Sequence, residues 1–90
     1  MRFIIYREEF VAGRRTTDLP EVIFATEDEA VARSQIDALF AEEMEDYLRK
    51  FSPVEARKDG RLWAVSSSPR SRFVRLGLID EQDPSTHLPG

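Results

Sequence analysis

The sequence predicts an α+β fold, in which one long helix packs across one face of a mainly antiparallel sheet, in the order β-β-α-β-β-β. Two observations predict it. Residues 26–51 carry apolar side chains at spacings of three and four, between helix signals at both ends. On either side lie short segments rich in β-branched and aromatic residues, separated by turns that contain glycine or proline. A helix with one apolar face needs a surface to cover it, so a two-layer sandwich follows.

The N-terminal part of the chain reads as two strands. Residues 2–10 have apolar side chains on both alternating sets, and residues 21–25 form a second β-rich run. Between them, residues 12–20 contain a glycine, several polar residues and a proline, which favour a turn. We therefore expect a long-looped hairpin with Arg14 and Arg15 at its tip, where an exposed arginine pair is most often simply solvated.

Both ends of the helix carry signals. Thr26 can cap the first turn while Glu29 reaches back to the Thr26 amide, which is the pattern of a capping box. Arg49 and Lys50 fall in the last turn, where the helix dipole favours positive charge. Pro53 prevents the helix from continuing.

The helix is amphipathic, and its polar side is well supplied with charge pairs. Its apolar stripe comprises Ile36, Leu39, Phe40, Met44, Tyr47, Leu48 and Phe51. Acid-then-base pairs four residues apart are Glu29 with Arg33, Glu45 with Arg49, and Asp46 with Lys50. Each such pair adds about 0.2 to 0.5 kcal/mol and suits a solvated surface.

The C-terminal half predicts three further strands. Residues 54–57 and 61–66 flank Asp59-Gly60, a strong signal for a tight hairpin turn. Residues 66–71 are serine-rich and contain a proline, so they read as a loop. Residues 72–79 then form the last strand, with Val74, Leu76 and Leu78 on one face and Phe73, Arg75 and Ile79 on the other.

Length and composition predict one small domain. The chain has 90 residues, of which 41% are hydrophobic, enough for a modest core. We expect residues 1–80 to form a single α+β domain and residues 81–90 to be a flexible C-terminal tail. The absence of cysteine excludes disulfides and favours a cytoplasmic location. The apolar runs are too short to span a bilayer, so no membrane association is expected.

Charge is divided unevenly along the chain. Residues 1–49 hold 12 acidic and 6 basic side chains, a net charge of −6. Residues 50–75 hold 2 acidic and 7 basic side chains, a net charge of +5. An acidic helix thus shares the domain with a basic hairpin, and such polarity can steer association with a charged partner. The alternative is two solvated surfaces that attract each other.

The sequence offers little for catalysis. The one histidine, His87, lies in the expected tail, and no phosphate-binding glycine loop or nucleophile elbow is present. Glu43 lies at the edge of the apolar stripe, where burial could suit it to acid catalysis, but the simpler expectation is that it reaches water or an arginine. We predict a protein that is not an enzyme and that needs no cofactor or metal.

By elimination, the function expected is that of a protein-binding regulator or inhibitor. The surfaces considered are an acidic helix face or the sheet face that the single helix leaves open. The residues expected to bind a partner are Glu42, Glu45, Asp46, Trp63 and Phe73. Clustered carboxylates could also mimic nucleic-acid phosphates, by analogy with small phage-encoded inhibitors of host defence. A charge run on a helix is, however, usually just a solvated face.

The alternative is a nucleic-acid-binding module built on the basic hairpin. In that interpretation basic side chains follow phosphates while the Trp63 ring stacks on a base. The residues concerned are Arg57, Lys58, Arg61, Arg70 and Arg72. Against it stand the acidic net charge of −4 and the frequent placement of tryptophan in cores.

The sequence also predicts a homodimer, because the apolar residues exceed what one helix can cover. The residues expected at the interface are Phe3, Ile5, Trp63 and Phe73. Two copies could stack their open sheet faces or join their edge strands. The competing explanation is a sheet that curls enough to bury both of its faces within one chain.

Overall fold

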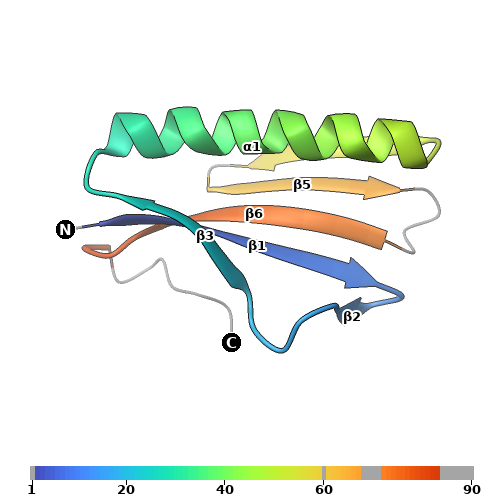
Figure 1. The fold of residues 1–90 in the computed structure, drawn as a ribbon, viewed down its shortest axis with the longest axis horizontal. Helices are drawn as coiled ribbons and strands as arrows, with labels where there is room; N and C mark the ends of the chain where they lie inside the picture. The colour runs from blue at the N-terminus through green and yellow to red at the C-terminus, as the bar shows by residue number, and fades with distance from the viewer. Residues whose placement is uncertain (1, 60, 68–71, 84–90) are drawn as a thin grey trace.

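The computed structural model describes residues 2–59, 61–67 and 72–83, and it confirms the α+β fold. The elements in order are β1 (Phe3–Val11), β2 (Arg14–Arg15), β3 (Glu21–Thr26), α1 (Glu29–Lys50), β4 (Val54–Asp59), β5 (Leu62–Ser67) and β6 (Arg72–Asp80). Figure 1 shows the single helix lying along one side of the sheet. The expected order is thus found with one addition, the two-residue strand β2.

The described strands form one antiparallel sheet in the order β2-β1-β6-β5-β4, with β3 also paired to β1. Its centre is the pairing of the first long strand with the last, which runs without a shift from Phe3 opposite Asp80 to Val11 opposite Arg72. The predicted β4–β5 hairpin is confirmed, with Asp59 opposite Leu62. Gly60, in the predicted turn, lies outside the described residues.

The segment between β1 and β3 makes two turns, where the sequence indicates one loop. The chain reverses at Ala12 and Gly13, whose φ angles of 52° and 80° suit a tight hairpin turn. Arg15 then pairs opposite Phe10 before the chain leaves the sheet and returns as β3. The expected pairing of the two N-terminal β-rich runs is confirmed by the β1–β3 register, which contains a bulge where Ile23 is skipped.

The start of the helix differs from the prediction. Asp28 is the N-cap, and its Oδ1 accepts hydrogen bonds from the amides of Ala30 and Val31 at 2.9 and 3.3 Å. The expected capping box of Thr26 and Glu29 is wrong, because Thr26 is still paired in the sheet opposite Phe3.

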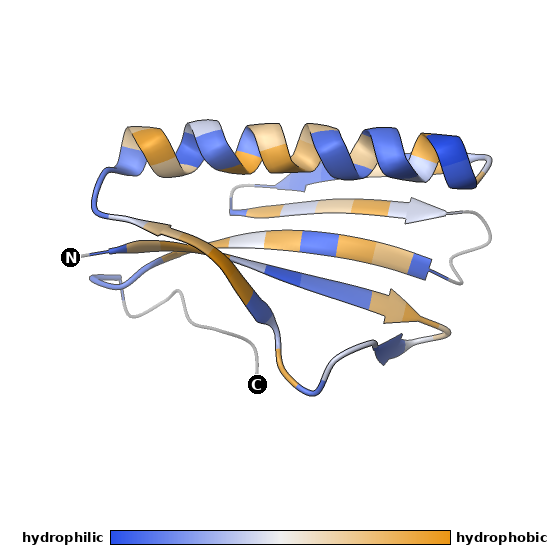
Figure 2. Cartoon of the chain, viewed as in Figure 1, coloured by the Kyte–Doolittle hydropathy of each residue, from blue (hydrophilic) through white to orange (hydrophobic). Residues whose placement is uncertain are grey.

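The core lies between the helix and the facing set of strand residues. The buried hydrophobic side chains of this layer are Phe3, Ile5, Ala32, Ile36, Tyr47, Trp63, Val65, Val74, Leu76 and Leu78. The predicted helix stripe is found except for Leu48, which is 62% exposed, whereas Ala32 is fully buried. Figure 2 shows apolar and hydrophilic residues alternating around the helix accordingly.

The residues expected at a dimer interface occupy different layers. Phe3, Ile5 and Trp63 are wrong as interface residues, because they belong to the alternating set under the helix and are buried there. Only Phe73 lies on the other side of the sheet, where it faces Phe10. Part of the apolar surface that was expected to need a second copy is thus buried beneath the helix of the same chain.

Two segments expected to be irregular are partly ordered. Ser66 and Ser67 continue β5, and Ser67 Oγ donates a hydrogen bond to the Arg72 carbonyl at 3.2 Å. Residues 68–71 of that predicted loop lie outside the described residues. At the C-terminus, Glu81 forms an ion pair with Arg2 at 3.0 Å, and residues 84–90 again lie outside the described residues.

Candidate functional site

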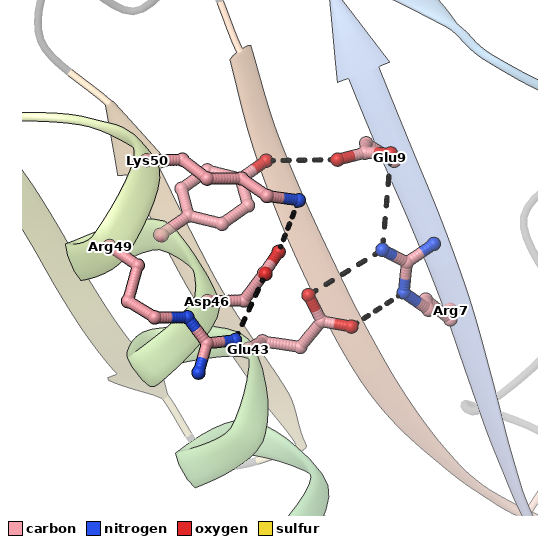
Figure 3. Close-up of polar contacts among 7 residues, drawn as sticks. Arg7, Glu9, Glu43, Asp46, Arg49 and Lys50 are labelled. Atoms are coloured by element: carbon pink, nitrogen blue, oxygen red, sulfur yellow. Dashed lines mark hydrogen bonds and ion pairs between the residues drawn. The ribbon is translucent and has the colours of Figure 1, made fainter.

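A polar cluster joins the helix to the first strand (Figure 3). Arg7 Nε donates to Glu43 Oε1 at 2.7 Å, and an Arg7 terminal nitrogen lies 3.9 Å from Glu9. The Tyr47 hydroxyl donates to Glu9 at 3.3 Å. The expectation that Glu43 reaches an arginine rather than standing alone as an acid is therefore confirmed.

The contacts within this cluster shift the pKa values of Arg7 and Tyr47. Burial lowers the pKa of Arg7, but the hydrogen bond and charge of Glu43 outweigh that effect, so the pKa is raised overall. Burial, together with the charge of Glu9 and the hydrogen bond to it, raises the pKa of Tyr47. The arginine stays charged and the tyrosine neutral, so the cluster acts as a fixed polar contact between layers.

The acidic helix residues point outward, but most of their charge is already paired. Asp46 lies 3.1 Å from Lys50 and 3.4 Å from Arg49, and Figure 3 shows both basic side chains reaching toward it. The hydrogen bond from Lys50 lowers the pKa of Asp46. Glu45 lies 3.7 Å from Arg49, so of the three predicted acids only Glu42 has no ion pair within the described part of the chain. This side of the helix is therefore mostly solvated, and its acidic and basic side chains largely neutralise each other.

A second cluster lies on the side of the sheet away from the helix. We call it the open-face cluster, and it comprises Glu8, Phe10, Arg15, Phe73 and Arg75. Glu8 Oε2 accepts from Arg15 Nε at 2.9 Å, and Oε1 accepts from Arg75 Nε at 2.7 Å. The Glu8 side chain is 0% exposed, while those of Arg15 and Arg75 are 19% and 31% exposed.

Two aromatic rings complete the open-face cluster. Phe10 and Phe73 are direct neighbours on β1 and β6, and their rings stack with centroids 4.6 Å apart. The guanidinium carbons of Arg75 and Arg15 lie 5.1 and 5.9 Å from the Phe10 ring centroid. Cation–π contact and charge pairing therefore hold the two arginines over one buried carboxylate.

Sequence reasoning missed most of this cluster. Arg14 is exposed as expected, but Arg15 is not simply solvated, because the turn at Gly13 brings it back against Glu8. The available signal was the position of Glu8 between Tyr6 and Phe10 on one alternating set, which places a carboxylate among aromatic residues. Its arginine partner on β6 is 67 residues away, and only the sheet register reveals it.

Next to the open-face cluster, the sheet buries a tyrosine without help from the helix. Tyr6 lies over Gly77, where any side chain on Gly77 would collide with the Tyr6 ring. Burial, and then the charge of Glu8, raises the pKa of Tyr6. Because glycine has no side chain, Gly77 leaves space for the Tyr6 ring on this face.

The basic residues of the hairpin that the structure describes do not form one surface. Lys58 contacts Asp37 of the helix at 3.1 Å, while Arg57, the neighbour on β4, faces the other side of the sheet by strand alternation. Arg61 pairs with Asp83 at 3.2 Å, and Arg72 lies over Phe51. Arg70 lies outside the described residues.

Trp63 is a core residue, only 2% exposed, and it packs beneath the helix. Lys58 Nζ lies 5.4 Å from its ring centroid. The five predicted partner-binding residues are therefore distributed over three places: the acids on the helix, Trp63 in the core, and Phe73 on the open face. A buried ring offers no platform for stacking a base.

Among the described residues, no group of histidine, cysteine or acidic side chains has the arrangement of a metal site. No helix in the described part of the chain is both long and apolar enough to cross a membrane. Comparison with protein-family models, curated proteins and solved structures found no match for this chain.

Proposed function

We propose that this protein is a non-catalytic regulator or inhibitor that binds a protein partner through the open-face cluster. The observation that supports this proposal is the stacked Phe10–Phe73 pair, flanked by two arginines and not covered by the helix. Aromatic residues and arginine are enriched at the centres of protein interfaces. A buried carboxylate holds both guanidinium groups in fixed positions, so little side-chain entropy remains to be lost on binding.

The chemistry of the cluster defines the kind of surface it would accept. The Phe10–Phe73 pair suits an apolar side chain of the partner. Arg75 contacts Glu8 through Nε and keeps about a third of its side chain exposed, so its outer nitrogens can meet a carboxylate. We therefore expect a partner segment that combines an apolar anchor with an acidic residue.

The other two surfaces have weaker support. The helix acids are largely neutralised by Arg49 and Lys50 from the same helix. The nucleic-acid alternative has less support, because its stacking ring, Trp63, is buried. The basic side chains of the hairpin that the structure describes also face different sides, so these four form no continuous basic patch.

The test compares capture by matched baits. Wild-type protein, Phe73→Ala and the helix double variant Glu42→Lys/Glu45→Lys are immobilised, and captured proteins are identified by mass spectrometry. The partner is then purified and its affinity is measured by calorimetry. We expect Phe73→Ala to weaken binding at least tenfold, about 1.4 kcal/mol, while the helix variant stays close to wild type.

The opposite pattern, with loss of binding in the helix variant alone, would overturn the assignment to the open face. Thermal melts of each bait establish that all three are folded. Strong retention of the wild type on DNA or heparin that disappears with salt would instead favour the nucleic-acid alternative.

A further inference from the structure

Strand β4 is the regular free edge of the sheet. It pairs with β5 from Val54 opposite Ser67 to Asp59 opposite Leu62, and no other described strand pairs with it. Five of its six residues are exposed. The opposite edge is different, because it is made of the two-residue β2 and of β3, whose pairing with β1 contains a bulge. Bulges protect an edge from pairing with another chain, and β4, which begins directly after Pro53, pairs with β5 without one.

From this edge we infer that two copies of the chain associate by pairing their β4 strands antiparallel about a twofold axis at Ala56. Such an axis keeps both helices on one side of a continuous sheet, so residues opposite each other come from the same alternating set. With Ala56 opposite Ala56 of the second copy, Glu55 lies opposite Arg57 in two symmetric places. Opposite charges that face each other across strands are favourable.

The same charges exclude the neighbouring arrangements. A shift that centres the axis on Arg57 places the two arginines opposite each other and Glu55 opposite Asp59. A shift that centres it on Glu55 places two carboxylates together. Like charges directly opposite destabilise a sheet, so the sequence of β4 specifies one register.

An exposed apolar residue on the helix lies toward the same edge of the sheet. Asp37 contacts Lys58 of β4, and Leu48 lies eleven residues further along, on the same side of the helix. Leu48 is 62% exposed, although the helix pattern predicts its burial. In the proposed dimer, Leu48 of each copy lies on the helix side of the joined sheet, toward the shared edge.

The consequence is a bivalent molecule. Both open-face clusters lie on the side of the joined sheet away from the helices, so two partner molecules, or two sites on one partner, could be bound together. The dimer itself does not depend on the function proposed above, because it uses the β4 edge, whereas the open-face cluster is built on β1, β2 and β6.

Cysteine cross-linking tests the register directly, because the natural chain has no cysteine. Residues directly opposite have Cβ atoms about 5 Å apart, whereas diagonal neighbours are about 7 to 8 Å apart. We expect Ala56→Cys to form a disulfide-linked dimer on mild oxidation, with little cross-linking for Glu55→Cys or Arg57→Cys alone. Mixing the last two variants should produce a heterodimer.

Charge exchange provides a second readout by light scattering. Glu55→Arg and Arg57→Glu should each weaken dimerisation at least tenfold, and the double variant should return to within about threefold of wild type. Circular dichroism and thermal melts check that each variant is folded. A monomer mass unchanged over a tenfold range of micromolar concentration overturns the dimer. A dimer that cross-links equally at all three positions, or only through Phe73→Cys on the open face, overturns this interface.

Discussion

Replacing Glu8 by alanine should destabilise the protein far more than its position in an exposed-looking, charged stretch suggests. The carboxylate is completely buried and receives two arginines at 2.7 to 2.9 Å. Removing one partner of a buried ion pair costs about 3 to 5 kcal/mol when the remaining charge stays buried. Here Arg15 and Arg75 can partly reach water, which places the cost near the lower value, about 3 kcal/mol.

For a domain of this size, about 3 kcal/mol corresponds to a fall of at least roughly 12 °C in melting temperature. The matched control is Glu81→Ala, which removes an exposed ion pair with Arg2 and should cost no more than about 1 kcal/mol. Thermal unfolding followed by circular dichroism measures both. A difference in melting temperature of less than 2 °C between the Glu8 and Glu81 variants corresponds to about half a kcal/mol on the same scale. That result would show that the open-face cluster is not a stabilising network.

Three further predictions test other parts of the fold. Gly77→Ala should cost about 1 to 3 kcal/mol in urea unfolding, because the new methyl group displaces the Tyr6 ring, and an unchanged midpoint would contradict that packing. The pKa values of both tyrosines, Tyr6 and Tyr47, are raised by burial above the usual value near 10, so their contribution to stability is complete below pH 10 and is lost as the pH rises further. Absorbance at 295 nm should therefore show tyrosinate appearing together with unfolding, and reversible ionisation of the native protein near pH 10 would refute the burial. Asp28→Ala should lower stability by about 1 kcal/mol through loss of the N-cap, whereas Glu29→Ala should cost less than half as much; equal losses in thermal melts would restore the capping box.

Much of the fold could be predicted because it depends on neighbouring residues. The apolar spacing of the helix, the Asp59-Gly60 turn and the three charge pairs at four-residue spacing are all local, and each pair is present in the structure. The faces of β6 were also predictable, since alternation along a strand follows from backbone geometry alone.

The misassigned residues share a different cause. Thr26 has good helix-capping chemistry, but β1 competes for it, and the ladder extends the sheet by one residue before Asp28 takes the cap. Leu48 fits the helical stripe, yet Tyr47 and Phe51 pack on the core beneath this part of the helix while Leu48, on the side of Asp37, extends past it. In both cases the extent of the sheet overrode a local preference. The local sequence pattern carries no information about that extent.

The sequence by itself determined the long elements, though not β2, and which alternating residues share a face, because these follow from backbone periodicity. The tertiary structure alone decided that β1 lies between β3 and β6, and that Glu8 therefore meets Arg15 and Arg75. Residues that are close in the sheet but 67 positions apart in the chain leave no periodic trace. The candidate binding surface arises from such a long-range pairing, and only the register of β1 against β6 places its charges and rings together.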